Sequence, residues 1–290
     1  MPKVSVLMPV YKTNEKYLKE AIDSILKQTY KDFELIILED CPEDDREAIV
    51  KSYDDTRIKY IKNEKNMGIA FSRNRLISIA KGEYIAMADS DDISYSLRLE
   101  KQVSYLDEHK DVSLVGAWYE CFPQSAKIAE FPENVSLLDM LKWCAIAQPC
   151  VMFRKSDFEN KQLKYDNNFI TAEDYDLWCR ALMCGCKLSN IQEVLLKYRV
   201  HPNSVSHTKN KQTFLGASKV QNKIVTCLTE DKSLQKKLLE SFTNNGALRI
   251  EKVVYLFNII PFIKIKIKDK IQKWKLFNLF PIVKIKETNK

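Results

Sequence analysis

The sequence is poor in the residues that make flexible linkers, with only 6 glycines and 9 prolines among 290 residues. It has no Ser/Gly-rich stretch, and low complexity is confined to residues 251–290. A boundary between two large domains is therefore not visible. Because 45% of the residues are hydrophobic and 29% are charged, we expect a globular protein with either one large domain or a domain plus appendages.

Paired cysteines and an export signal are also missing. None of the eight cysteines stands in the CxxC spacing of a zinc site, so we expect buried, reduced thiols. The amino terminus, MPKVSVLMPVYKT, lacks a basic region, a long apolar stretch and a small-residue cleavage site. These features predict a cytosolic protein.

The first 250 residues have no excess of charge, because basic and acidic side chains balance there. Residues 251–290 contain ten Lys and three acidic residues, and so carry the whole net charge of +7. This distribution argues against a nucleic-acid enzyme with a basic cleft, and no nucleic-acid partner is expected. It favours a local electrostatic attachment through the tail.

Apolar runs alternate with segments of helical period in the first ninety residues. The predicted strands are 3–9, 33–39, 57–61 and 83–88, and the predicted helices are 14–28, 43–52 and 69–80. Such alternation predicts right-handed crossovers and a mainly parallel sheet with helices on both faces. Ligands of these sheets bind beyond the carboxyl ends of the strands.

Polar residues follow three of these strands: Tyr11, then Asp40, then the acids of EYIAMADSDD at 83–92. Parallel strands place their carboxyl ends at one edge, so we expect these residues to converge. Carboxylates as close in sequence as Asp89, Asp91 and Asp92 repel one another unless a positive charge shares the site. The pattern therefore predicts a divalent cation there.

The next hundred residues add predicted helices at 96–109, 135–145 and 171–185, and strands at 112–122 and 148–154. Glu173 and Asp174 lie in the first turn of the helix at 171–185. Acids in that position favour the positive end of the helix dipole, which would explain them without any chemistry. A functional role is the alternative.

Seven segments together carry a resemblance to a known family. They are VSVLMPVYKT (4–13), LED (38–40), NMGIAFSRNRL (66–76), GEYIAMADSDD (82–92), QPCVMFR (148–154), AEDYDLWCRA (172–181) and YRVHPNSVS (198–206). In this order they resemble family 2 glycosyltransferases with the GT-A fold, a Rossmann-like, mainly parallel sheet flanked by helices. The stretch EDCPED differs from the Asp-Asp-Gly-Ser-x-Asp of many members, which leaves the preferred base open.

The resemblance implies a nucleotide-sugar donor, with UDP favoured, and Mn²⁺ or Mg²⁺ on its diphosphate. Asp91 would be the first metal ligand, and Asp89 would reach the metal or the ribose. Asp40 would accept a hydrogen bond from the base, over a floor formed by Pro9–Tyr11. Arg73 would neutralise part of the diphosphate, unless it is a helix-surface residue.

The same resemblance implies that Asp174 is the general base of an inverting transfer, in which one displacement occurs at the anomeric carbon. Glu173 would bind acceptor or cap the helix, and Gln148 would contact the acceptor. Arg199 and His201 would meet the phosphates or metal, although a packed or solvent-facing histidine is an alternative.

Two other functions stay open. A non-catalytic sugar-binding or scaffold homologue would keep the fold without the acids. A nucleotidyltransferase typically has a Gly-rich, basic loop after its first strand, where this chain has MPVYKTNEKY.

From the extent of the resemblance and the composition of the tail, we expect three parts. These are a catalytic domain at 1–206, a helical extension at 207–250 and a basic-aromatic tail at 251–290. The tail contains one motif twice, as LFNIIPFIKIK at 256–266 and as LFNLFPIVKIK at 276–286. Each apolar run is too short to span a bilayer. The combination of Lys with apolar and aromatic residues instead suits an anionic membrane surface. We therefore expect the protein to attach peripherally at the inner face of the cell membrane. Its acceptor would be a glycan or a polyprenol-linked sugar there. Packing on its own domain or on a second subunit of a homo-oligomer is the alternative.

Overall fold

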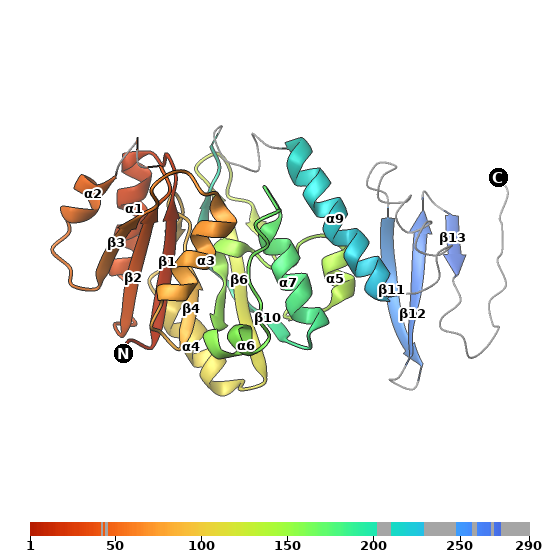
Figure 1. The fold of residues 1–290 in the computed structure, drawn as a ribbon. Helices are drawn as coiled ribbons and strands as arrows, with labels where there is room; N and C mark the ends of the chain where they lie inside the picture. The colour runs from red at the N-terminus through yellow and green to blue at the C-terminus, as the bar shows by residue number, and fades with distance from the viewer. Residues whose placement is uncertain are drawn as a thin grey trace.

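The computed structural model describes residues 1–41, 43, 46–201, 210–228, 248–256, 260–267 and 270–273 (Figure 1). Within them, one mixed sheet lies between two layers of helices. Its strands are β1 Val4–Val10, β2 Phe33–Glu39, β3 Ile58–Lys62, β4 Tyr84–Met87, β5 Ile93–Ser94, β6 Val112–Phe122, β7 Ile128–Ala129, β8 Asn134–Val135, β9 Met152–Arg154 and β10 Lys187–Arg199. The helices are α1 Glu15–Leu26, α2 Glu47–Lys51, α3 Ile69–Ile79, α4 Arg98–Glu108, α5 Leu137–Lys142, α6 Lys155–Asn160, α7 Glu173–Met183 and α9 Asn210–Leu228.

The strand order is β3-β2-β1-β4-β9-β6-β10-β5, with β7 on β6 and β8 on β10. The first four strands are parallel to one another, as are β6 and β10, which confirms the predicted mainly parallel sheet. β9 runs antiparallel to β4 and β6 and joins the two parallel parts. β1 lies between β2 and β4, so the carboxyl ends of these three strands meet at one edge, where ligands of such sheets bind.

Three predicted elements are much shorter in the structure than in the sequence pattern, and one of them is the helix expected at 135–145, which is α5 with six residues. The strand expected at 148–154 is a 3-10 turn, Gln148–Cys150, followed by β9, because Pro149 has no N–H to give to a sheet. The helix expected at 43–52 is α2, of five residues.

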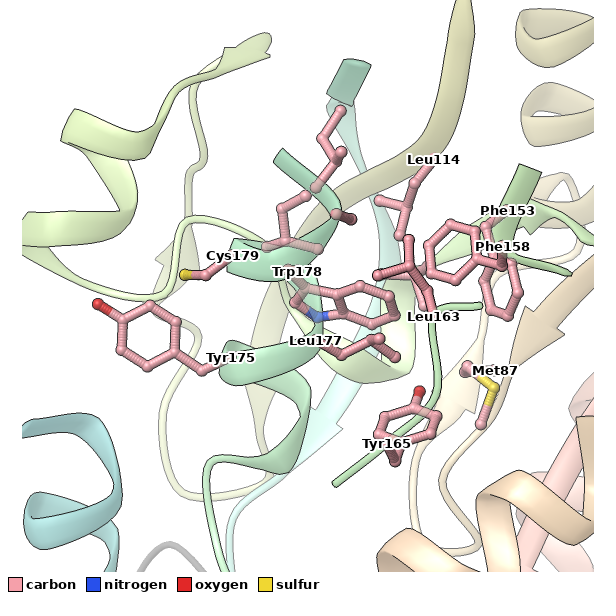
Figure 2. Packing of buried hydrophobic residues seen from close by; sticks show 14 of the residues in the cluster. Met87, Leu114, Phe153, Phe158, Leu163, Tyr165, Tyr175, Leu177, Trp178 and Cys179 are labelled. Carbon is pink, nitrogen blue, oxygen red and sulfur yellow. The ribbon is translucent and has the colours of Figure 1, made fainter. Parts of the chain in front are cut away.

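Alternate residues of β1 enter the cores on opposite faces of the sheet. Val6 and Met8 pack with residues of α1 and α4, whereas Leu7 packs with residues of α3 and α7. This period of two is what a strand covered on both sides requires. The second core centres on Trp178, which is fully buried and lies among Phe153, Phe158, Tyr165, Leu177 and other apolar side chains (Figure 2).

The extension beyond β10 is helical in its first described part. α9 falls within the predicted helical segment 207–250 and packs against α7 and α5 (Figure 1). The tail is not helical where the structure describes it: strands β11 Leu248–Leu256, β12 Ile260–Ile267 and β13 Lys270–Lys273 form an antiparallel sheet. The domain boundary at 206 and the second copy of the repeat, 276–286, lie outside the described residues. Among the described helices, none combines the length and hydropathy required to cross a membrane.

We predict that Trp178→Ala lowers the free energy of unfolding by about 3–5 kcal/mol, because it empties a large volume in a closed core. Trp178→Phe should cost clearly less, because much of the ring is kept. The indole Nε1 has no hydrogen-bond partner among the described residues, so its removal breaks no bond. Urea denaturation of the two variants measures both values, and equal losses would contradict this account of the core.

Candidate active site

Asp40 follows β2 and fixes the loop that leads into α3. Its Oδ1 accepts hydrogen bonds from Asn63 Nδ2 at 2.6 Å and from the Met67 amide at 2.8 Å, and its Oδ2 accepts one from the Gly68 amide at 2.9 Å. Each carboxylate oxygen offers about two acceptor positions, so only Oδ2 keeps one for a ligand. The predicted contact with a base therefore depends on this oxygen.

The acidic loop after β4 is held from several sides. Asp92 is buried, and its Oδ1 accepts the backbone N–H of Arg199 at 2.7 Å. Asp91 is more open, and its Oδ2 lies 2.9 Å from His201 Nε2. Burial, together with the neighbouring acids, raises the pKa of Asp92 well above its usual range. Burial also raises the pKa of Asp89, although the Arg73 charge opposes this effect.

Arg199 serves this loop as a buried anchor. Its Nε donates to the Asp91 carbonyl at 2.6 Å and its Nη2 to Glu20 Oε2 at 2.5 Å. Its guanidinium also lies over the rings of Tyr17 and Phe122, at 4.1 and 4.4 Å from their centres. These contacts favour a structural role over the phosphate contact expected from the sequence. His201 lies at the acidic loop, as expected, where it contacts Asp91 and the Tyr17 ring.

Arg73 on α3 links the acidic loop to α7. Its Nη1 donates to Glu173 Oε1 at 2.5 Å, and its Nη2 lies 3.5 Å from Asp89 Oδ1. The side chain is buried, with the ring of Tyr165 at 5.5 Å from the guanidinium carbon. Arg73 is therefore not a helix-surface residue, and it joins two acids that are 84 positions apart in the sequence.

Asp174 occupies the first turn of α7, next to Glu173. It is half-buried, and its Oδ1 accepts the Tyr175 amide at 2.8 Å. Among the described residues, nothing donates a hydrogen bond to its Oδ2. The Asp174 charge contributes to the raised pKa of Asp89, which places the two carboxylates within electrostatic range.

Glu173 is buried beside Arg73 and Asp174. Burial raises its pKa to about 7; the Arg73 charge lowers it and the Asp174 charge raises it further. This value lets the carboxyl change its protonation state near neutral pH.

The remaining predicted residues take supporting positions. Gln148 is buried, and its Nε2 donates to the Tyr165 hydroxyl at 2.9 Å, so it does not face an open acceptor site. Pro9 lies beyond the last pair of β1 and β4, Leu7 with Met87, where a strand tolerates proline. Tyr11 is 49% exposed at the same edge, and Lys12 Nζ lies 5.5 Å from the centre of its ring.

The acidic loop has a donor set that fits Mg²⁺ or Mn²⁺. Carboxylate oxygens of Asp91 and Asp89 suit both ions, and an imidazole such as that of His201 suits transition metals. No group of three His, Cys, Asp or Glu side chains in the described part of the chain is arranged to hold a metal ion. Two carboxylates supply only part of the six oxygen ligands of Mg²⁺, so an ion held here would take its other ligands from outside these side chains.

The fold and this edge of acids define a GT-A-type α/β domain. The family model described as glycosyl transferase family 2 matches residues 5–173, more than half of the chain. The chain therefore belongs to glycosyltransferase family 2.

Curated relatives agree with this assignment. An uncharacterized glycosyltransferase of Methanocaldococcus jannaschii is 40% identical over 224 residues, which cover 73% of this chain and 77% of that protein. The UDP-Glc:alpha-D-GlcNAc-diphosphoundecaprenol beta-1,3-glucosyltransferase WfaP of Escherichia coli is 34% identical, with 73% and 83% covered. The O-antigen biosynthesis glycosyltransferase WbnJ of Escherichia coli is 37% identical, with 69% and 81% covered.

Solved structures share the fold at low identity. TarS 1-349 of S. aureus, in complex with UDP-GlcNAc, superimposes with a TM-score of 0.67 at 21% identity, covering 83% of this chain and 72% of that chain. The mannosyltransferase PcManGT of Pyrobaculum calidifontis, in complex with GDP-Man and Mn2+, gives 0.62 at 14% identity, covering 84% and 71%.

The sequence pattern missed the residues that support the site. Asn63 holds Asp40, Tyr165 lies against Arg73, and Tyr17 and Glu20 hold Arg199. Only Asn63 had a signal, because it is a polar residue directly after a strand, β3. The other three lie in segments that a helix or loop pattern explains fully.

We predict that the stability of the parent, relative to Glu173→Gln, falls as the pH rises from 4.5 to 7. The folded-state pKa lies above the unfolded value of 4.5, so the unfolded chain loses its proton first over this range. The stabilisation by the protonated carboxyl is complete below pH 4.5 and lost towards pH 7. The difference between a pKa of about 7 in the folded state and 4.5 in the unfolded state corresponds to roughly 3 kcal/mol.

Urea denaturation of both proteins at several pH values measures this difference. Glutamine keeps the shape of the side chain but does not titrate, so the other acids cancel. Parallel pH profiles of the two proteins would contradict the raised pKa.

Proposed function

We propose that the chain is an inverting, metal-dependent glycosyltransferase that moves a sugar from a UDP-sugar to a lipid-linked or glycan acceptor. The observation that carries this proposal is the bridge made by Arg73, which draws Asp89 at the donor edge and Glu173 beside Asp174 to one place. A transferase of this kind needs the donor's diphosphate and the base on opposite sides of one sugar.

The donor side would be formed by Asp91 and Asp89, with His201 next to Asp91. A divalent cation held there, when bound, offsets the charge that develops on the leaving diphosphate. Arg73 adds a fixed positive charge nearby, although its ion pairs with Glu173 and Asp89 already compensate much of this charge. Tyr11 lies where it can cover the base, and Asp40 Oδ2 has one acceptor position for a base N–H.

The acceptor side would be formed by Asp174. Its Oδ2 takes the proton of an acceptor hydroxyl while that oxygen forms a bond to the anomeric carbon. The bond from this carbon to the diphosphate oxygen breaks, and the nucleoside diphosphate leaves with the electron pair. Attack from the face opposite the nucleotide inverts the configuration.

The donor and acceptor classes rest on relatives. The name of WfaP gives UDP-Glc as its donor and a diphosphoundecaprenol-linked sugar as its acceptor, and TarS was solved with UDP-GlcNAc. WbnJ is named for O-antigen biosynthesis. We therefore place this chain in cell-surface polysaccharide synthesis, on the cytosolic side of the membrane. Family membership gives the nucleotidyltransferase alternative no support.

Two substitutions separate the donor role from the base role. We predict that Asp91→Asn abolishes the Mn²⁺-dependent thermal protection that a UDP-sugar gives the parent, because a metal ligand is lost. Asp174→Asn should keep this protection and lower the turnover of the same UDP-sugar by roughly 10²–10⁴-fold, as expected for loss of a general base. Thermal unfolding and nucleotide release measure the two effects.

UDP-glucose and UDP-GlcNAc are the first donors to test, with GDP-mannose as the control for base selection. Protection of the parent without turnover, unchanged by Asp174→Asn, would indicate the non-catalytic sugar-binding homologue. No protection by any nucleotide-sugar would refute a donor site at this edge.

The tail at 251–290 would attach the enzyme to an anionic membrane surface. Ten Lys residues alternate with apolar and aromatic residues there, which suits the headgroup region. Each Lys near such a surface contributes about 1 kcal/mol, and salt weakens this attraction.

We predict that the full chain sediments with phosphatidylglycerol vesicles at low salt, and that a chain ending at residue 250 does not. Neutral phosphatidylcholine vesicles serve as the control for charge. Donor protection of the shortened chain shows that the catalytic domain is intact. If it sediments as well as the full chain, the tail is not the membrane anchor, and packing on protein becomes the better explanation.

A further inference from the structure

The extension helix α9 comes unusually close to the turn that precedes the proposed base. Gly216 is buried on α9, and a Cβ added there would lie 2.7 Å from the Thr171 carbonyl oxygen and 3.1 Å from Ala172 Cβ. The first contact is with backbone, which cannot rotate away. Only glycine therefore lets α9 approach this turn so closely.

The turn itself has a conformation that needs support. Ala172 has φ 64° and ψ 22°, in the left-handed region that non-glycine residues avoid. Such a residue persists only where its surroundings hold it. Ala172 is also the N-cap of α7, and its carbonyl accepts the Asp176 amide at 3.0 Å. The conformation of Ala172 thus sets the direction in which Asp174 leaves the turn.

A second contact fixes α9 along α7. Lys223 Nζ donates to Asp176 Oδ1 at 2.5 Å, and Arg180 Nε donates to Asp176 Oδ2 at 2.7 Å. Asp176 is completely buried, and each of its two carboxylate oxygens is paired with one of these cations. Val220 and Ile224 on the same face of α9 are also fully buried.

The family match ends at residue 173, so all of α9 lies beyond it. We propose that α9 nevertheless belongs to the active site: its close approach at Gly216 holds the Thr171–Ala172 turn and thereby positions Asp174. Gly216 and Lys223 are positioning residues, because they act on Asp174 through the turn and through Asp176. The proposal deepens the proposed function and rests on its assignment of Asp174.

The substitution Gly216→Ala tests this proposal, because helix propensity alone predicts the opposite effect on stability. Alanine favours a helix more than glycine does, so a variant without a relevant contact would be at least as stable and as active as the parent. We expect instead that the Tyr175 and Asp176 amides exchange hydrogen at least about tenfold faster, because the turn is displaced. Turnover of UDP-glucose or UDP-GlcNAc by hydrolysis should fall about 10–100-fold with an unchanged KM for the donor.

Controls separate a positioning effect from a loss of folding. Lys219→Ala changes an exposed residue on the same helix and should leave exchange and turnover as in the parent. Amides of α3, on the donor side, should keep the exchange of the parent in every variant. If Gly216→Ala does not fold, Lys223→Met takes its place. For this variant we also expect lower turnover with an unchanged KM for the donor.

Parent-like exchange at Tyr175 and Asp176, or parent-like turnover, in Gly216→Ala would overturn the inference. A parent that neither binds nor hydrolyses any UDP-sugar would instead refute the proposed function. In that case the exchange measurement still decides whether α9 holds the turn.

Discussion

Repulsion between carboxylates at one edge of the sheet is the constraint on which this structure depends. Asp89 and Asp92 share the acidic loop after β4, Arg73 links Asp89 to Glu173, and burial raises the pKa of all three acids. Buried arginines make this arrangement tolerable, and Arg98 on α4 lies within electrostatic range of Asp89 and Asp92. Arg73 compensates Asp89 and Glu173 directly, and Arg199 holds the acidic loop through its backbone N–H and its guanidinium.

The topology explains why so few cations are sufficient. β1 lies between β2 and β4, so residues that are distant in sequence leave the sheet at the same edge. Arg73 starts on α3, directly above this edge, and Arg199 ends β10, the strand beside β5 that follows the acidic loop. Each arginine therefore reaches acids from two separate segments, and the same ion pairs that balance the charge also connect the layers.

The sequence predicted the parts of the site that depend on local pattern. Strand period and polar strand ends located Asp40 and the acidic loop, and the motif around Glu173 and Asp174 located the first turn of α7. Contacts between distant segments had no local signal, because nothing near Arg199 shows that Glu20 is its partner, and nothing near Gln148 shows that Tyr165 covers it. The strands of the tail were not predicted for a related reason: alternating Lys and apolar residues fit a strand as well as a membrane-surface segment.

The hydrogen bonds of individual carboxylates distinguish the structural acids from those left for chemistry. Asp40 accepts three protein donors and Asp176 accepts two cations, so each keeps little capacity for a ligand. Asp174 accepts one amide through Oδ1, and its Oδ2 meets no donor among the described residues. Asp174 is only half-buried, so water can satisfy Oδ2, and a ligand that replaces this water breaks no hydrogen bond within the protein. Asp174 can therefore receive an incoming hydroxyl, as its proposed role requires, whereas the hydrogen bonds of Asp40 primarily hold the loop that leads into α3.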